Sequence, residues 1–188
     1  MEKKYKLTEE TKELCGRTLH RIEALKDFGD VKAGGKGGFI EKEENLSQEG
    51  DAWVSGDAQV YGDARVYGDA QVSGDAQVYG DARVYGDAWV YGDARVYGDA
   101  RVYGNAQVYG DARVYGDADY VVFKNWWSSG RYFTWTRSNN MWKVGCFYGT
   151  GDELIKKAYA DGEKSGREYE RVVKYVESIL ADEEKNKE

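Results

Sequence analysis

The stretch GDARVYGDARVY, residues 92–103, contains two copies of one six-residue unit. The same unit runs without insertion from Gly50 to Val121, which makes twelve consecutive hexads. Self-similarity at a fixed short period is the sequence signature of a repeat architecture, in which each unit packs only against its neighbours. The hexads therefore predict a solenoid over this part of the chain.

Each hexad has the spacing of a short β-strand followed by a corner. Its Ala and Val are two residues apart, so both side chains point to the same side of an extended strand, while the residue between them points outward. One hexad cannot bury its own apolar side, but stacked coils cover one another. The chain has 188 residues with 24 Gly and no Pro, which suits a ladder that uses every backbone N–H donor.

This pattern resembles the hexapeptide-repeat left-handed β-helix. The resemblance implies three hexads per coil, so that twelve hexads form four coils of a triangular prism. It also supplies the left hand, because the period does not decide handedness and the general rule for parallel crossovers favours the right hand. We therefore expect an all-β solenoid of about four regular coils, closed at both ends by non-repeating caps.

Three hexads per coil place residues that are eighteen positions apart in one column. The outward columns of the three faces are then Trp53, Gln71, Trp89 and Gln107; Gln59, Gln77, Arg95 and Arg113; and Arg65, Arg83, Arg101 and Asp119. Tyrosine columns run beside them, for example Tyr61, Tyr79, Tyr97 and Tyr115. Two interpretations stay open: the columns keep the stack in register, or one face docks a partner or a second copy.

Asp occupies eleven of the twelve corner positions, with Asn105 as the exception. Stacked coils lie about 4.8 Å apart, so neighbouring carboxylates repel by roughly 0.9 kcal/mol even in bulk water. Backbone N–H groups that donate to the Asp side chains, together with the outward arginines, are expected to offset this repulsion. The alternative is a functional acidic surface that mimics nucleic acid. Its candidate partner-binding residues are Asp57, Asp75, Asp93 and Asp111.

The charge imbalance lies in the repeat. Residues 50–121 carry 12 acidic and 5 basic side chains, a net of −7, whereas residues 1–49 and 122–188 carry nets of −1 and +1. A basic footprint is absent, so we expect no direct binding of nucleic acid. The start, MEKKYKLTEE, lacks the apolar core of a signal peptide, and no run has the length of a membrane span. We expect a cytoplasmic protein without a membrane partner, in which Cys15 and Cys146 are free thiols.

The first fifty residues are predicted to form the N-terminal cap. Residues 4–25 have the pattern of a β-hairpin that turns near Cys15 and Gly16, within a cap of residues 1–30. Residues 31–49 contain four glycines and are expected to form an irregular first coil ahead of the regular repeat, residues 50–121.

Aromatic residues gather after the repeat, in residues 122–149. Alternation around Ser138, Asn139 and Asn140 predicts a β-hairpin. This aromatic cap either plugs the last coil or anchors a partner, since Trp, Tyr and Arg dominate interface hot spots. Its candidate partner-binding residues are Trp126, Trp127, Arg131, Tyr132, Trp135 and Trp142.

The last segment, residues 150–188, is predicted to be helical. Thr150 and Glu153 have the spacing of a capping box, and one α-helix is expected to run to about residue 184, unless Gly162 and Gly166 divide it. A heptad pattern supplies an apolar seam that could pack on the solenoid or on another subunit of a dimer or trimer. The oligomerisation candidates are Tyr169, Val172, Val176 and Ile179.

Few residues carry the chemistry of an enzyme. Many proteins that share the hexapeptide repeat are acyltransferases with a His as general base, and this chain has one His, His20, outside the repeat. One His also cannot supply the three ligands of the zinc enzymes built on this helix. The GGKGG stretch lacks the spacing of a phosphate-binding loop, and the Asp spacing differs from that of calcium-binding repeats. We expect no catalytic residue, no cofactor and no metal.

The full arrangement also resembles small proteins common in phages and prophages of gut bacteria, through residues 17–54 and 123–150. This setting makes a host protein the expected partner. We predict a non-enzymatic interaction module that binds a host protein, in one version a nucleic-acid-handling defence enzyme such as a CRISPR nuclease. The alternatives are a self-assembling structural oligomer and an acyltransferase that uses His20.

Overall fold

The computed structural model describes residues 2–127 and 129–186 of the chain. The chain forms two compact units, of which the first is Met1–Val121 with Thr136–Asn139 and the second is Val122–Trp135 with Asn140–Glu188. The first unit contains the repeat, and the second contains the C-terminal helices. No helix within the described ranges is long and apolar enough to cross a membrane.

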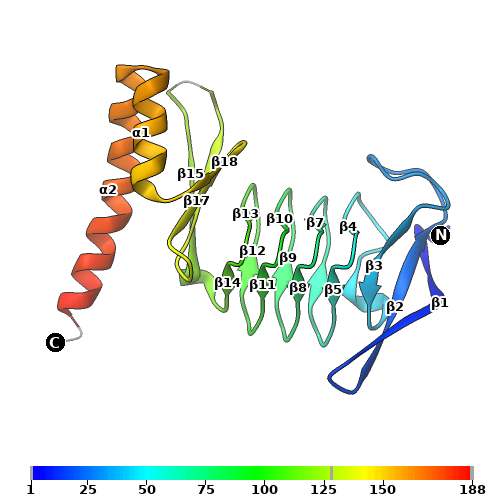
Figure 1. Cartoon of the computed structure of the whole chain (residues 1–188). Helices are drawn as coiled ribbons and strands as arrows, with labels where there is room; N and C mark the ends of the chain where they lie inside the picture. Colours follow the sequence, from blue (N-terminus) through cyan, green and yellow to red (C-terminus); the bar gives the residue numbers. More distant parts are fainter. Residues whose placement is uncertain (1, 128, 187–188) are drawn as a thin grey trace. The chain divides into compact units, whose positions relative to one another are not determined.

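The repeat forms a parallel β-solenoid, which confirms the predicted fold class (Figure 1). Its strands are β4 (Trp53–Val54), β5 (Gln59–Val60), β6 (Arg65–Val66), β7 (Gln71–Val72), β8 (Gln77–Val78), β9 (Arg83–Val84), β10 (Trp89–Val90), β11 (Arg95–Val96), β12 (Arg101–Val102), β13 (Gln107–Val108) and β14 (Arg113–Val114). One face stacks β4, β7, β10 and β13, a second stacks β5, β8, β11 and β14, and a third stacks β6, β9 and β12. The register between coils is eighteen residues, as in the pair of Trp89 with Gln71.

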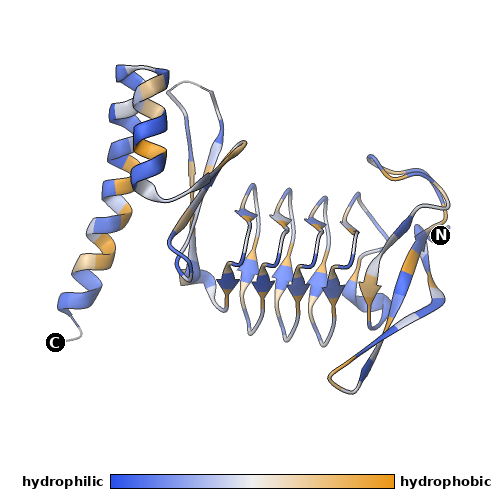
Figure 2. Cartoon of the chain, in the orientation of Figure 1, coloured by the Kyte–Doolittle hydropathy of each residue, from blue (hydrophilic) through white to orange (hydrophobic). Residues whose placement is uncertain are grey.

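The core of the solenoid is made of the Ala and Val of each hexad. Every Ala from Ala52 to Ala112 and every Val from Val54 to Val114 within the hexads is at most 1% exposed. Hydrophilic and hydrophobic residues alternate along the coils in Figure 2. Backbone N–H groups donate to the next coil, for example from Gln77 to the Ala94 carbonyl at 2.9 Å. These bonds and the buried methyl groups together hold the stack.

At corners that a further coil covers, glycine is required for two reasons. Gly74 has a φ of 72°, in the left-handed region that favours glycine. A Cβ atom at Gly74 would also lie 3.1 Å from the backbone nitrogen and oxygen of Gly92 in the next coil. The corner therefore needs both the conformation and the small size of glycine.

The twelfth hexad departs from the predicted column. Asp119 does not continue the column of Arg65, Arg83 and Arg101, because residues Asp117–Asp119 form a short 3-10 helix, η2. The Asp119 carboxylate accepts hydrogen bonds from the backbone N–H groups of Tyr115 at 2.7 Å and Gly116 at 2.9 Å. The repeat thus ends in a turn stabilised by its own acid rather than in a further strand.

The N-terminal hairpin is present as predicted. β1 (Tyr5–Leu14) and β2 (Arg17–Ala24) are antiparallel, and β2 also pairs with β3 (Lys36–Ile40). β3 in turn pairs in parallel with β5, so the cap continues one face of the solenoid. The 3-10 helix η1 (Glu43–Asn45) and the bridge from Leu46 to Val66 complete a first coil with a register of twenty residues, which is the expected irregular coil.

The aromatic segment forms a four-stranded sheet with strand order β15, β16, β17, β18. These strands are β15 (Tyr120–Lys124), β16 (Tyr132–Thr136), β17 (Met141–Val144) and β18 (Phe147–Gly149). The predicted turn lies between β16 and β17. Its residues Thr136–Asn139 belong to the first unit, where the Ser138 hydroxyl accepts a hydrogen bond from the Arg113 N–H at 2.7 Å. This turn therefore caps the last coil.

Two helices follow, as in the predicted alternative in which Gly162 divides the segment. α1 (Gly151–Asp161) begins with the predicted capping box, in which the Thr150 hydroxyl accepts from the Glu153 N–H and the Glu153 carboxylate accepts from the Thr150 N–H. Gly162, with a φ of 146°, ends α1, and α2 (Glu163–Lys185) packs back against it. Gly166 lies inside α2 and faces Tyr159 of α1, so it permits close packing rather than a break.

Candidate functional site

The corner carboxylates of the first coils are paired by the chain itself. Lys42 Nζ lies 2.8 Å from the Asp63 carboxylate, and Arg21 Nη2 lies 3.5 Å from Asp57. The lysine lowers the pKa of Asp63 by hydrogen bonding and by its charge. At the next corner, the Asp69 carboxylate accepts a hydrogen bond from the Asp51 N–H at 3.1 Å. The N-terminal cap therefore compensates Asp57 and Asp63.

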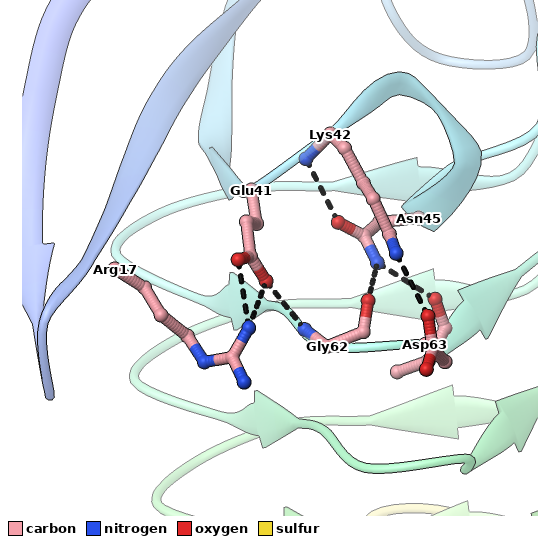
Figure 3. A network of polar contacts seen from close by, with 7 residues as sticks. Arg17, Glu41, Lys42, Asn45, Gly62 and Asp63 are labelled. Carbon is pink, nitrogen blue, oxygen red and sulfur yellow. Dashed lines mark hydrogen bonds and ion pairs between the residues drawn. The ribbon is translucent and has the colours of Figure 1, made fainter.

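A polar network explains how this cap is held (Figure 3). The Glu41 carboxylate accepts from Arg17 and from the Gly62 N–H, both at 2.7 Å. The buried Asn45 side chain donates to the carbonyl of Gly62 at 3.1 Å and to that of Ala64 at 2.9 Å. The Asn45 side chain thus bonds to the Gly62 and Ala64 carbonyls, the groups that elsewhere in the repeat accept from the backbone of the preceding coil.

The C-terminal end of the solenoid follows the same principle. Asn139 Nδ2 donates to the Asp111 carboxylate at 3.0 Å, and the Arg101 N–H donates to the Asp117 carboxylate at 3.1 Å. Both contacts involve residues at the last coil. Asp111 and Asp117 at this end are therefore bonded, as Asp57, Asp63 and Asp69 are near the other end.

The acids of the middle coils have no such partners. Within residues 2–127 and 129–186, six exposed corner carboxylates make neither a hydrogen bond nor an ion pair. They are that of Asp51, beside the cap, and those of five acids between the ends, namely Asp75, Asp81, Asp87, Asp93 and Asp99. The expected bonds from backbone N–H groups occur at Asp69 and Asp117 but not at these five. The expected pairing with solenoid arginines is also absent from the described residues, since no arginine of the repeat forms an ion pair with a corner acid there.

Two tyrosine columns are stacked in parallel over most of their length, up to the edge-on contact of Tyr115 with Tyr97. Rings of Tyr61 and Tyr79 lie 5.0 Å apart with an interplanar angle of 2°, and those of Tyr79 and Tyr97 lie 5.2 Å apart. A second column stacks Tyr67 on Tyr85 at 4.9 Å. Burial raises the pKa of Tyr61 to about 12, so its hydroxyl stays neutral at physiological pH. The stacks stiffen the surface on which the charges are displayed.

The face of β4, β7, β10 and β13 is unevenly covered. Trp53 in β4 is 4% exposed, whereas Trp89, two coils further in the same column, is 49% exposed. The Trp89 ring makes an edge contact with Tyr91 at 6.2 Å, and Tyr91 contacts Tyr109 at 4.4 Å. An exposed aromatic group of this kind, set among unpaired acids, is the surface feature that most favours recognition of a partner.

The aromatic candidates of the second unit divide into two groups. Trp135 and Trp142 are each 2% exposed, and Phe133 lies 6.5 Å from Trp142, so both tryptophans belong to a core and cannot offer their rings to a partner in this structure. Trp126 is 83% exposed, and Arg131 is exposed as well. Tyr132 and Trp127 are half-buried.

The seam candidates of α2 pack largely within the second unit. The Tyr169 ring lies 4.6 Å from that of Phe133, and Val176 is 3% exposed. Val172 and Ile179 are half-buried. The most buried valine of α2 is Val173, which is 1% exposed and lies outside the predicted seam. The α2 surface that faces α1 and the sheet is wider than a single heptad line. Oligomerisation through this seam stays a prediction.

The side chains with the chemistry for catalysis are one histidine and two cysteines. His20 Nδ1 lies 3.2 Å from the Thr8 carbonyl oxygen inside the hairpin, where the ring is half-buried. Cys15 and Cys146 are exposed free thiols. Among the residues that the structure describes, no three His, Cys, Asp or Glu side chains are grouped as metal ligands would be.

The sequence did not predict that Lys4 is buried or that Trp53 and Trp89 differ in exposure. Lys4 is 1% exposed, and its ammonium donates to the carbonyls of Glu49, Gly50 and Ala52. A lysine in a polar N-terminal stretch carries no signal of burial. For Trp53, its position in the first coil, beside the cap, was the one available signal of cover.

Two comparisons with known proteins support the hexapeptide type of solenoid. A family model described as the YdcK beta-solenoid repeat matches residues 58–75, 76–92, 94–107 and 106–118. The chain is also 38% identical over 60 residues to a protein of Escherichia coli (strain K12) named "Uncharacterized acetyltransferase YdcK". This match covers 28% of the chain and 18% of the relative, so the chain spans less than a fifth of that protein's length.

Proposed function

We propose that this protein is a non-enzymatic interaction module that binds another protein through the outward surface of its solenoid. One observation carries the proposal: near both ends the chain pairs corner carboxylates with its own donors, all except Asp51, whereas five consecutive ones between the ends are unpaired. Columns of like charge are costly when nothing compensates them. A cationic surface of a partner would compensate the middle coils as the caps compensate the ends.

The solenoid is suited to this role because its surface is preorganised. Tyrosine rings on neighbouring coils are held parallel and about 5 Å apart, as in the pairs of Tyr61 with Tyr79 and Tyr67 with Tyr85. Side chains that are already ordered lose little entropy when a partner binds. A rigid array of charges also steers the approach of an oppositely charged protein.

In its most specific form, the partner is a host enzyme that handles nucleic acid. Four coils span about 19 Å, and a net charge of −7 over residues 50–121 corresponds to one charge per ~2.7 Å, against one per ~1.7 Å of duplex DNA. A solenoid with this charge density would compete with nucleic acid for the basic groove of such an enzyme. This form predicts that short duplex DNA displaces the partner from the protein.

Affinity purification from a bacterial lysate at low salt tests the proposal. The bait is the full chain, compared with the triple variant Asp75→Asn, Asp87→Asn, Asp93→Asn. The matched control removes three exposed charges from the helices, through Asp161→Asn, Glu177→Gln and Glu184→Gln. We expect a stable partner with the wild type and the control and a loss of at least tenfold in recovery with the triple variant. Recovery of no partner by the wild type would contradict the proposal.

Acyl transfer is the second candidate, and the observation that favours it is the name of the E. coli relative. The matched repeats, residues 58–118, contain no His, and the single His of the chain is His20 in the hairpin. The test is calorimetric titration of the full chain with acetyl-CoA, beside a transfer assay of the wild type and His20→Ala. Binding of acetyl-CoA with activity that His20→Ala abolishes would establish this function in place of the first.

A further inference from the structure

We propose that Trp89, with the flanking Asp87 and Asp93, is a docking site for a protein segment that presents an aromatic side chain between basic side chains. The proposal rests on the function proposed above and names the surface and the chemistry of the partner.

The repeat contains two copies of this surface. Asp51, Trp53 and Asp57 recur 36 residues later as Asp87, Trp89 and Asp93. Both tryptophans pair in register with the intervening Gln71, so they stand in one column of one face. The acids lie at the corners on either side of this face. The two copies therefore present the same groups in the same arrangement, two coils apart.

The first copy is covered by the chain's own segments. The ring of Phe28 makes an edge contact with Trp53 at 5.3 Å, and that of Tyr5 makes another at 6.3 Å. These contacts leave Trp53 only 4% exposed. Edge-to-face packing of this kind adds to the gain from burying the apolar area. In the first copy, the tryptophan at this position is therefore covered by the edges of other aromatic rings.

The same covering segments bring cations to the flanking acids. Arg21 Nη2 lies 3.5 Å from the Asp57 carboxylate. Lys4 Nζ lies 5.1 Å from the centre of the Phe28 ring, and Lys4, Phe28 and Asp51 line one hollow. The Asp51 carboxylate favours the charged form of Lys4 and partly offsets the burial that lowers its pKa. An aromatic ring and two cations therefore occupy the first copy together.

The second copy has the same groups and no such cover. Trp89 is 49% exposed, and both Asp87 and Asp93 are exposed without a hydrogen bond or ion pair among the described residues. Tyr91 stands where the first copy has Ser55, and its ring contact with Trp89 enlarges the apolar part of the surface. Charge complementarity and the occupied copy point to one occupant, a basic segment with an aromatic residue at its centre.

A short peptide tests the site directly. The probe is acetyl-Gly-Lys-Phe-Arg-Gly-amide, titrated into the full chain while the indole N–H resonance of Trp89 is followed by NMR. The peptides with Ala in place of Phe, and with Glu in place of both Lys and Arg, test the aromatic and the basic parts separately. We expect the first to bind at least fivefold more weakly and the second to show no binding.

Variants of the protein locate the binding. Trp89→Gln introduces the residue that the same column already has at positions 71 and 107, so the fold should tolerate it. We expect this variant to bind the probe at least tenfold more weakly by calorimetry, and Asp87→Asn with Asp93→Asn at least fivefold more weakly. The matched control, Asp81→Asn with Asp99→Asn, removes two unpaired acids from another column and should bind within twofold of the wild type. Circular dichroism melting checks that each variant is folded.

The outcomes separate this proposal from the function on which it rests. Equal binding of the probe by the wild type and Trp89→Gln would overturn the docking site, as would a lysate partner that Trp89→Gln retains in full. If the wild type captures no partner but the probe binds through Trp89, the site stands and the interaction function falls. Self-association that Trp89→Gln abolishes in sedimentation velocity would make a second copy the occupant and overturn the assignment to a different protein.

Discussion

At the scale of single residues, Lys4 shows how a solenoid closes its first coil. The carbonyls at the start of a solenoid face no earlier coil that could donate to them. The Lys4 ammonium donates to the carbonyls of Ala52 at 2.8 Å, Gly50 at 3.2 Å and Glu49 at 3.4 Å. One flexible side chain with three donors thus replaces the backbone N–H groups of a missing coil.

Replacement of Lys4 by Met should therefore destabilise the protein. The methionine fills a similar volume but leaves buried carbonyls without a donor, which costs about 2 kcal/mol after the gain from removing a buried charge. Urea unfolding measures the change. The control is Lys6→Met, at an exposed lysine that pairs with Glu23, where we expect less than about 1 kcal/mol. Equal effects of the two substitutions would contradict the capping role.

The same lysine predicts a dependence on pH. Burial lowers the pKa of Lys4 from 10.5 to about 8, against the opposing effect of Asp51. Below pH 8 the amine is charged in both states, and folding bears the full cost of burying the charge. Between pH 8 and pH 10.5, the pKa values of the folded and unfolded states, the unfolded state binds more protons, so the stability of the folded state rises with pH. The unfolding free energy of the wild type, measured in urea, should therefore rise relative to that of Lys4→Met between about pH 7 and about pH 9.5. A difference between the two proteins that stays constant over this range would argue against a lowered pKa.

At the scale of elements, the corners and the helix pair depend on glycine for different reasons. A Cβ at Gly74 would meet the backbone of the next coil, whereas one at Gly104 has no atom within 4 Å. Both glycines have a positive φ, 72° and 63°. In α2, by contrast, Gly166 is helical, and what matters is the close approach of Tyr159.

The two corner glycines allow strain and contact to be measured separately. Gly104→Ala should cost about 1 kcal/mol, the price of a left-handed conformation for alanine. Gly74→Ala adds contacts of 3.1 Å with the backbone of Gly92, so we expect a loss of about 2–3 kcal/mol in unfolding free energy. Thermal and urea unfolding of the two variants provide the comparison. A larger loss at Gly104 would show that conformation rather than contact limits the corner.

The helix pair predicts an inverted effect at Gly166. Gly→Ala inside a helix ordinarily stabilises by about 0.5–1 kcal/mol. Here the added Cβ would overlap Cδ1 and Cγ of the Tyr159 ring, so Gly166→Ala should destabilise the second unit. In the background of Tyr159→Ala, the same substitution should regain its ordinary stabilising sign. Calorimetric melting of the wild type, the two single variants and the double variant measures these effects. A stabilising effect of Gly166→Ala in the wild-type background would be incompatible with the close packing of Gly166 against Tyr159.

At the scale of the whole molecule, contacts with the non-repeating end segments determine which corner carboxylates are paired. The acids near both ends have partners, except Asp51, and the five acids from Asp75 to Asp99 do not. Asp75 and Asp93 are neighbours in one column, one coil apart. Their repulsion is a cost that the free protein bears and that salt can screen.

Salt should therefore stabilise the protein, and less so when this column is neutralised. At low ionic strength, Asp75→Asn with Asp93→Asn should raise the unfolding free energy by about 1 kcal/mol, because it removes neighbouring like charges. The gain should vanish near 0.5 M NaCl, where screening is strong. Asp161→Asn with Glu184→Gln changes the net charge equally and serves as the control. A gain of the same size in the control would attribute the effect to net charge alone.

Much of the fold could be predicted from the period of the sequence, and the surface could be predicted less well. The Ala and Val core, the eighteen-residue register and both hairpins follow from local patterns. The handedness, which rested on resemblance, stays a prediction. The candidate acids were placed in the right column, but Asp57 and Asp111 have partners from the caps whereas Asp75 and Asp93 do not. Trp135 and Trp142 were chosen for their type, and only packing shows that both are buried.

The sequence by itself determined the parts of this protein in which each coil is a template for the next. Identical hexads adopt identical local conformations and bury identical methyl groups, so no distant contact is needed to specify them. The tertiary structure alone decided which of two equivalent tryptophans is covered, which acids are paired and that Lys4 is buried. These differences between equal positions arise where a non-repeating segment packs onto one coil and not onto another, and a periodic sequence carries no record of that choice.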